Sequence, residues 1–164
     1  MASFALQVVP TSLGQSPSNE KLALARDLLS SYISYSDDTI RVAIFSKPTL
    51  VDTGVAFENI ECPLCHSIIS RFEGDEHDEW WDDMETKISE SESPLQQALE
   101  MPCCSQAVRA EQLNFKGAAR FVNWMLRAND YELHSERMNL EKEQLAAIEK
   151  VLGCEVTELI GVNG

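Results

Sequence analysis

Two pairs of closely spaced cysteines constrain this chain more than any other feature of its sequence. The first pair lies in the segment Cys62-Pro63-Leu64-Cys65, and the second pair is Cys103-Cys104, which follows a proline. Two thiolates separated by two residues can bind one tetrahedral ion, because a tight turn points both sulfurs the same way. The spacing therefore predicts a zinc site, with the metal ligands Cys62, Cys65, Cys103 and Cys104.

Three alternatives to this four-cysteine site stay open on sequence alone. Adjacent cysteines are unusual zinc ligands, so His66 or His77 is an alternative fourth ligand. In the second alternative, Cys62 and Cys65 form a redox pair. In the third, the cysteines are small buried apolar residues. The fifth cysteine, Cys154, lies in an apolar segment, and we expect it to be a core residue.

The cysteine count and the N-terminal residues bear on the compartment. Five is an odd number, so the cysteines cannot all pair in disulfides within one chain. Residues 1–10 have no basic residue before a short apolar stretch, which is unlike a signal peptide. No run of 18 apolar residues predicts a membrane span. We therefore expect a cytoplasmic protein with reduced thiols.

The charge of the chain restricts its partners. The sequence has 27 Asp and Glu residues against 13 Lys and Arg residues, which gives a net charge of -14. Such acidity opposes binding to nucleic-acid phosphates and to anionic membranes, and it favours a partner protein with a basic surface. Hydrophobic residues make up 44% of the chain. We expect a single folded domain over residues 1–164, with a cysteine-rich insert at about 60–105.

An acidic, tryptophan-containing helix is predicted between the two cysteine pairs. Ten acidic residues lie between Glu73 and Glu92, and only Lys87 opposes them. The helical spacing of Trp81, Met84 and Ile88 predicts one apolar stripe and an acidic outer face. This face is either a solvated surface or a docking surface for a basic protein. The candidate partner-binding residues are Glu76, Asp78, Glu79, Trp80, Asp82 and Asp83.

The N-terminal third is predicted to contain two strands and a helix. Residues 4–9 are mostly apolar, and Pro10 follows them directly, which favours an edge strand. A helix is predicted to begin at Pro17, with Ser16 as its N-cap. Several β-branched residues predict a strand over 39–45, and we expect Pro48 to end it.

The C-terminal third predicts two more strands around a helix. Residues 117–128 are apolar on both alternating faces, which favours a buried strand. The helical period over 140–152 ends at Gly153, and alternation predicts a last strand over 154–160. The elements together predict an α+β fold with a mostly antiparallel sheet, flanking helices and a zinc clasp. The strand-helix-strand order also leaves parallel pairing open.

The order of Cys-Pro-x-Cys, an acidic Trp-rich helix and Pro-Cys-Cys resembles a set of small bacterial proteins of unknown function. Residues 112–115 (QLNF) and 117–122 (GAARFV) are also similar to theirs, so the resemblance covers roughly residues 50–130. It implies a glycine after each cysteine pair, where this chain has His66 and Ser105, and glycine would relieve the turn there. The resemblance implies a metal-binding fold and no activity.

Two classes of function are consistent with these features. No glycine-rich phosphate loop or HExxH pattern is present, and a zinc ion with four protein ligands has no open position for a substrate. The first class is a non-enzymatic acidic protein-binding module with a structural zinc site, in one form an immunity protein that neutralises a basic toxin. The second class is a thiol-redox or metal-handling protein that uses Cys62 and Cys65.

Overall fold

The computed structural model describes residues 3–36 and 40–163. These residues form two compact units. The first unit takes in the described residues within 1–46, 53–55 and 122–164, and the second takes in 47–52 and 56–121. Each unit has a hydrophobic core of its own. The predicted cysteine-rich insert lies wholly within the second unit.

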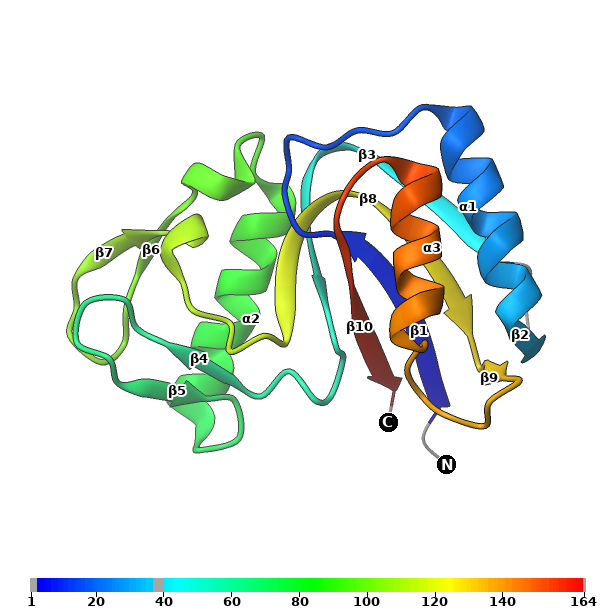
Figure 1. Ribbon diagram of the computed structural model, residues 1–164. Coiled ribbons are helices and arrows are strands. Elements are labelled where there is room, and N and C mark those ends of the chain that lie inside the picture. The colour runs from blue at the N-terminus through cyan, green and yellow to red at the C-terminus, as the bar shows by residue number, and fades with distance from the viewer. Residues whose placement is uncertain (1–2, 37–39, 164) are drawn as a thin grey trace. The chain divides into compact units, whose positions relative to one another are not determined.

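A four-stranded sheet with the strand order β10-β1-β8-β3 forms the centre of the first unit (Figure 1). Its strands are β1 (Ser3–Pro10), β3 (Arg41–Asp52), β8 (Ala119–Asn129) and β10 (Val156–Asn163). β1 pairs antiparallel with β10 over its whole length, and it pairs antiparallel with β8 on its other side. The parallel pairing that the element order left open does not occur among these three strands.

Two sequence predictions for this sheet are wrong. β1 lies between β10 and β8 and is not an edge strand. Its proline, Pro10, stands at the end of the strand, where a missing N–H is tolerated. β3 continues through Pro48 to Asp52, because β3 is itself the edge strand and has a side on which no ladder hydrogen bond is needed. Thr39, in the strand predicted over 39–45, lies outside the described residues.

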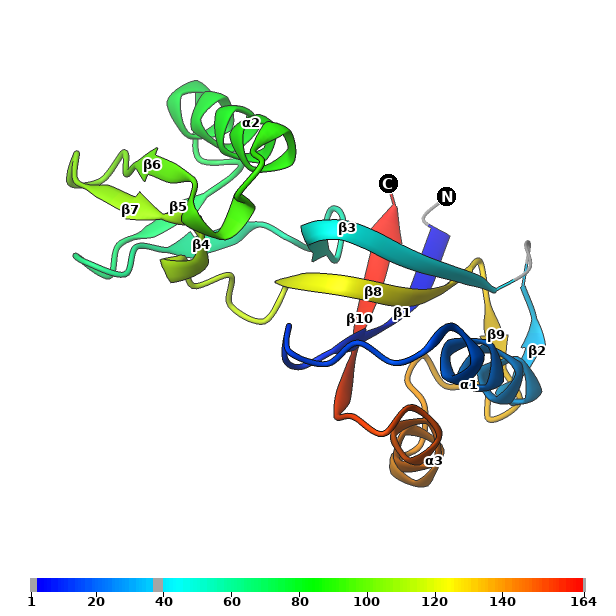
Figure 2. The ribbon, with the colours of Figure 1, turned by 90° about the horizontal axis from the view of Figure 1, so that it is seen from above.

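Helices α1 (Asn19–Tyr32) and α3 (Lys142–Leu152) lie side by side on one face of this sheet, as Figure 2 shows. A short ribbon of β2 (Ile33–Tyr35) and β9 (Glu132–Leu133) lies beyond the end of α1. The helices and the sheet bury one apolar core. Its members include Leu6, Val8, Leu22, Ala25, Leu29, Trp124, Leu126, Ile148 and Leu152.

Local hydrogen bonds explain where these helices begin and end. Ser18 is the N-cap of α1, because its side chain accepts a hydrogen bond from the N–H of Lys21. The predicted cap, Ser16, instead accepts a hydrogen bond from the side-chain amide of Asn123. α3 ends at Gly153 as predicted, with a φ of 75° that glycine adopts without strain.

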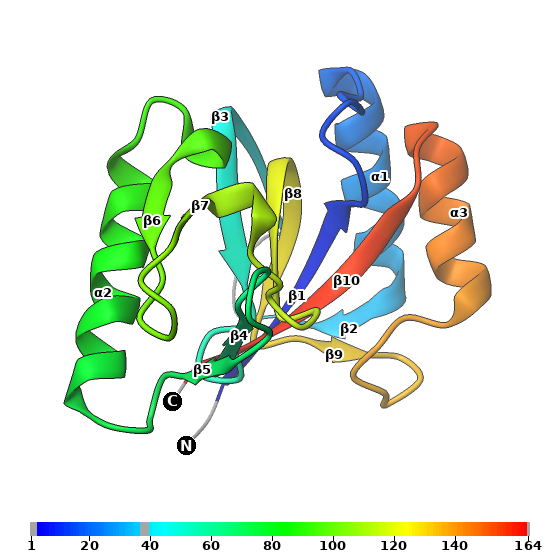
Figure 3. The same cartoon turned by 90° about the vertical axis from the view of Figure 1, so that its left-hand side faces the viewer.

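Two β-hairpins and one helix build the second unit. β4 (Asn59–Glu61) pairs with β5 (Ile68–Ser70), and β6 (Ala98–Glu100) pairs with β7 (Ala107–Arg109). Helix α2 (Asp75–Glu90) runs beside the β6–β7 hairpin (Figure 3). Single 3-10 turns at Pro94–Gln96 and Ala110–Gln112 lie before β6 and after β7.

The apolar stripe of α2 holds the helix on the core of the second unit. Trp81, Met84 and Ile88 are buried, as the helical spacing predicted. The Trp81 ring packs edge-on against Phe57 with ring centroids 4.7 Å apart, and such pairs add to the stabilisation from burial alone. Both hairpins contribute buried side chains to this same core. The core therefore fixes the two hairpins beside the helix.

The predicted α+β class, with mostly antiparallel strands and flanking helices, is confirmed. Every pair of strands for which the structure gives a register is antiparallel. Within the described residues, no helix is long and apolar enough to span a lipid bilayer.

Gly54 permits a close approach between the chain after β3 and the end of β10. Its φ is +66°, and a Cβ atom there would lie 2.2 Å from the carbonyl oxygen of Val162. That oxygen accepts a hydrogen bond from the N–H of Val55 at 2.9 Å. We expect Gly54→Ala to lower the free energy of unfolding by about 2–4 kcal/mol, since backbone strain and the clash add. Urea-unfolding midpoints measure this loss.

Gly153→Ala is the matched control for this variant. Gly153 is also left-handed, with a φ of +75°, but a Cβ atom there would lie 3.6 Å from Lys21 Nζ, which is ordinary contact. The control should lose only the cost of the left-handed conformation, about 1–2 kcal/mol. Equal losses in the two variants would contradict the importance of the contact between Gly54 and Val162.

Candidate metal centre and acidic groove

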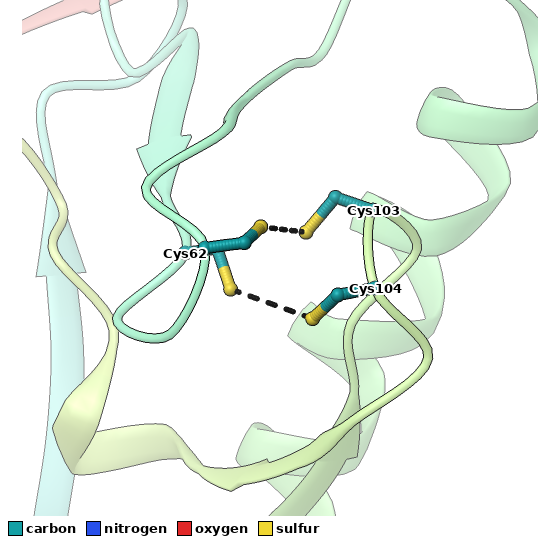
Figure 4. Close-up of side chains that lie close together, drawn as sticks. Cys62, Cys103 and Cys104 are labelled. Atoms are coloured by element: carbon teal, nitrogen blue, oxygen red, sulfur yellow. Dashed lines mark hydrogen bonds between the residues drawn. The ribbon is translucent and has the colours of Figure 1, made fainter.

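The two cysteine pairs lie in the loops of the two hairpins of the second unit. Residues 62–67, between β4 and β5, are called the first loop, and residues 101–106, between β6 and β7, are called the second loop. Figure 4 shows Cys62 in the first loop facing Cys103 and Cys104 in the second. The hairpin fold therefore brings together cysteines that lie far apart in the sequence.

The first loop is a tight turn closed by two backbone hydrogen bonds. The N–H of Cys62 donates to the carbonyl oxygen of Ser67 at 2.9 Å, and the N–H of His66 donates to that of Cys62 at 3.1 Å. His66 has a φ of 63°, in the left-handed region that glycine adopts most easily. The position at which the resemblance implies glycine therefore keeps a glycine-like conformation.

The second loop repeats this pattern with a different distribution of cysteines. The N–H of Met101 donates to the carbonyl oxygen of Gln106 at 2.9 Å, and the N–H of Ser105 donates to the carbonyl oxygen of Met101, also at 2.9 Å. Ser105 has a φ of 59°. The buried Met101 thus takes the position that Cys62 has in the first loop. The second cysteine pair occupies the third and fourth positions of the turn. Its adjacent cysteines therefore enter the cluster together.

Four sulfur atoms gather between the two loops. The Sγ atoms of Cys62, Cys65, Cys103 and Cys104 all lie within 4.8 Å of one another. Two hydrogen bonds between sulfur atoms link the loops, at 3.3 Å from Cys65 to Cys103 and at 3.9 Å between Cys62 and Cys104. Sulfurs about 2.3 Å from a tetrahedral ion are about 3.8 Å apart, so the cluster is close to the size that such an ion needs.

The environments of the four thiols differ. Cys62 is buried and Cys104 is partly buried, whereas Cys65 and Cys103 are exposed. Contacts with the hydroxyl group and the backbone N–H of Ser67 lower the pKa of Cys65 to about 6, and Cys65 Sγ lies 3.4 Å from Ser67 Oγ. Desolvation and the contact with the Cys65 sulfur raise the pKa of Cys103. Ser67 therefore favours a thiolate at Cys65, the form of cysteine that binds metal.

Neither of the histidines considered as a fourth ligand joins the cluster. His66 Nδ1 lies 3.5 Å from a carboxylate oxygen of Glu61, and His77 Nδ1 lies 3.1 Å from the backbone oxygen of Ser70. The group of possible metal ligands contains both adjacent cysteines and no histidine. Cys154 lies in the first unit, where it packs against the core as predicted.

Arg71 divides the acidic outer face of α2 into two strips. Its guanidinium group lies 2.9 Å from Glu85, 3.4 Å from Asp82 and 4.0 Å from Asp78. We call these three acids the paired strip. Burial raises the pKa of Glu85, and the charge of Arg71 opposes this rise. The paired strip is therefore partly neutralised within the chain.

The other strip of α2 lines a groove of about 410 Å³ that the second loop also lines. We call it the acidic groove. The Nε1 group of Trp80 donates a hydrogen bond across it to the backbone oxygen of Glu100 at 2.8 Å. Its charged lining consists of four carboxylates and one ammonium group, on Glu76, Glu79, Asp83, Glu100 and Lys87. Its remaining lining residues are Leu99, Met101, Pro102 and Ser105.

The structure separates the six candidate partner-binding residues. Four of them line the acidic groove, and the other two, Asp78 and Asp82, contact Arg71. Sequence reasoning missed Arg71, although it is a rare basic residue just before the acidic run. It also missed Ser67, whose position two residues after Cys65 was the available signal.

Comparisons of the chain with protein-family models, with curated proteins and with solved structures found no match. The resemblance to small bacterial proteins with the same order of cysteines therefore stays a prediction.

We expect Ser67→Ala to raise the pKa of Cys65 from its value of about 6. The variant loses the hydroxyl group and keeps the backbone N–H, so the pKa should stay below the ordinary value of about 8.5. Only the thiolate reacts with iodoacetamide, so the alkylation rate should rise with pH and level off above the pKa. Mass spectrometry of the reduced, metal-free protein measures this rate for each cysteine.

Cys154 is an internal control in the same samples, because burial raises the pKa of its thiol. It should react more slowly than Cys65 at neutral pH in both proteins. If the midpoint for Cys65 stays the same in Ser67→Ala, the hydroxyl group does not stabilise the thiolate.

Proposed function

We propose that this chain is a non-enzymatic protein-binding module in which a structural zinc ion supports an acidic groove. The main support for the proposal is that the second loop belongs both to the sulfur cluster and to the lining of the acidic groove. Cys103 and Cys104 belong to the sulfur cluster, while Met101, Pro102 and Ser105 line the acidic groove. An ion in the cluster would therefore also hold one part of the groove lining in place.

Zinc suits the sulfur cluster for two reasons. Tetrahedral sets of four thiolates bind zinc or iron, and the spacing of the four sulfurs fits a tetrahedral ion. Four protein ligands leave no position for water or substrate, which supports a structural role. Zinc has no redox chemistry of its own, and it suits a site that joins two hairpins.

Protein purified under reducing conditions without added metal should contain about one equivalent of zinc by elemental analysis, because structural sites hold the ion tightly. Removal of the ion with a chelator should lower the thermal midpoint, since an ion that binds only the folded state stabilises it by mass action. Cys65→Ser and Cys103→Ser should lose the ion.

Cys154→Ser is the matched control, because Cys154 lies outside the cluster and its loss should leave the metal content unchanged. One equivalent of iron would support the site and correct the identity of the ion. Less than roughly a tenth of an equivalent of any metal, with all thiols reduced, would rule out a structural metal site.

The acidic groove favours a basic segment of a partner protein. Lys87 lies 2.8 Å from Asp83 and offsets its charge, which leaves Glu76, Glu79 and Glu100 to attract Lys or Arg side chains. The ring of Trp80 offers these cations a further favourable contact. An inhibitor that masks a basic protein needs a dense negative surface of this kind, and an immunity protein for a basic toxin is one example.

A pull-down from a lysate of the source cells tests the acidic groove. The groove variant carries Glu76→Gln, Glu79→Gln and Asp83→Asn. At low salt it should recover roughly tenfold less of a basic partner than the wild type, because groove charges accelerate association. The difference should shrink at high salt, where screening weakens the same charges in the wild type.

The matched control carries Glu58→Gln, Glu90→Gln and Glu92→Gln. These three acids are exposed, lie in the same unit and outside the acidic groove, and make no ion pair among the described residues. The control loses the same net charge, and it should recover the partner as the wild type does. If the groove variant also recovers it fully at low salt, the acidic face is only a solvated surface.

A further inference from the structure

We infer that Cys65 and Cys103 form an oxidation-sensitive pair, and that a disulfide between them expels the ion from the cluster. This inference rests on the proposed zinc site and adds a redox response to it. The pair differs from Cys62 and Cys65, the redox pair that spacing alone suggested. The difference arises because two hydrogen bonds between sulfur atoms run from one loop to the other, as the dashed lines in Figure 4 show.

Covalent geometry favours the pairs between the loops. The Sγ atoms of Cys65 and Cys103 are 3.3 Å apart, so they need to approach by about 1.3 Å to form a disulfide. A disulfide between Cys103 and Cys104 would be strained, because neighbouring Cα atoms are about 3.8 Å apart, which is below the usual range for disulfides. A bond within the first loop would leave these two only this strained pairing. Pairing between the loops therefore oxidises all four cysteines without a strained bond between neighbours.

Exposure selects the pair that reacts first. Cys65 and Cys103 are exposed, whereas Cys62 is buried and Cys104 is partly buried. A small oxidant such as hydrogen peroxide can therefore reach Cys65 and Cys103 from solvent. These two cysteines also make the shorter of the two sulfur–sulfur hydrogen bonds that link the loops. The exposure to solvent and the short sulfur–sulfur distance thus both indicate Cys65 and Cys103.

Formation of this disulfide consumes one peroxide molecule. The Cys65 thiolate attacks a peroxide oxygen, so an S–O bond forms, the O–O bond breaks and hydroxide leaves. The Cys103 thiolate then attacks the Cys65 sulfur, so an S–S bond forms, the S–O bond breaks and a second hydroxide leaves. Two protons from solvent convert the two hydroxides to water. Two electrons pass from the two sulfurs to the peroxide oxygens.

The ion leaves because half of its ligands are lost. Cys62 and Cys104 alone do not complete a tetrahedral site, so zinc departs as Zn²⁺ with its oxidation state unchanged. Their sulfurs are 3.9 Å apart, and a second peroxide can join them in the same way. The two loops remain linked throughout, first by the ion and then by disulfides.

The test uses the full chain with Cys154→Ser, so that only the four cluster cysteines can react. Zinc-loaded protein is titrated with hydrogen peroxide, released zinc is measured with a chromogenic chelator, and disulfides are mapped by mass spectrometry. One equivalent of peroxide should release the zinc and give Cys65–Cys103 as the main disulfide. A second equivalent should add Cys62–Cys104, and a thiol reductant with added zinc should restore the starting form.

The same titration of reduced, metal-free protein separates this inference from the proposed function. A chain that binds no zinc would overturn the structural site, but the map of its disulfides would still decide the pairing. A first disulfide between Cys62 and Cys65 would overturn the inference. Zinc that is retained while Cys65 is converted to sulfinic acid would also overturn it.

Discussion

The backbone hydrogen bonds that close the two hairpin loops determine the arrangement of the cysteine cluster. Each loop pairs the N–H of its first residue with the carbonyl of its sixth, and each places its fifth residue in the left-handed region. The first residues, Cys62 and Met101, are fully buried and anchor the loops in the core. The later cysteines of each loop then reach the space between them. Without these matched turns, cysteines separated by the 37 residues from 66 to 102 would not meet.

Repulsion between like charges destabilises helix α2, and a few cations reduce this effect. Neighbouring carboxylates on a helix repel one another by a few tenths of a kcal/mol per pair. Arg71 contacts three acids of the paired strip, and its guanidinium also lies 5.4 Å from the Trp81 ring centroid. One side chain therefore both offsets part of the charge of the helix and contacts the core residue Trp81. Glu76 and Glu79 make no ion pair among the described residues, which explains the sign of the acidic groove.

Local sequence patterns predicted the features that depend on a few neighbouring residues. The buried stripe of α2 and the helix end at Gly153 belong to this class. The interior position of β1 and the passage of β3 through Pro48 depend on strand order, which no local pattern contains. For the site, spacing predicted which four cysteines come together. The role of Met101 in setting the register of the second loop, and the contacts of Arg71, required the fold.

The second loop, of six residues, contributes to both the cysteine cluster and the acidic groove. Met101 buries its side chain, but a short loop gains too little from burial to fix every residue against its conformational entropy. Ser105 adds the cost of a left-handed backbone, about 1–2 kcal/mol. In the proposed zinc form, binding of the ion offsets both costs and orders the groove lining. Disulfides link the same loops with different angles at sulfur, so oxidation would preserve the hairpins while it changes the groove.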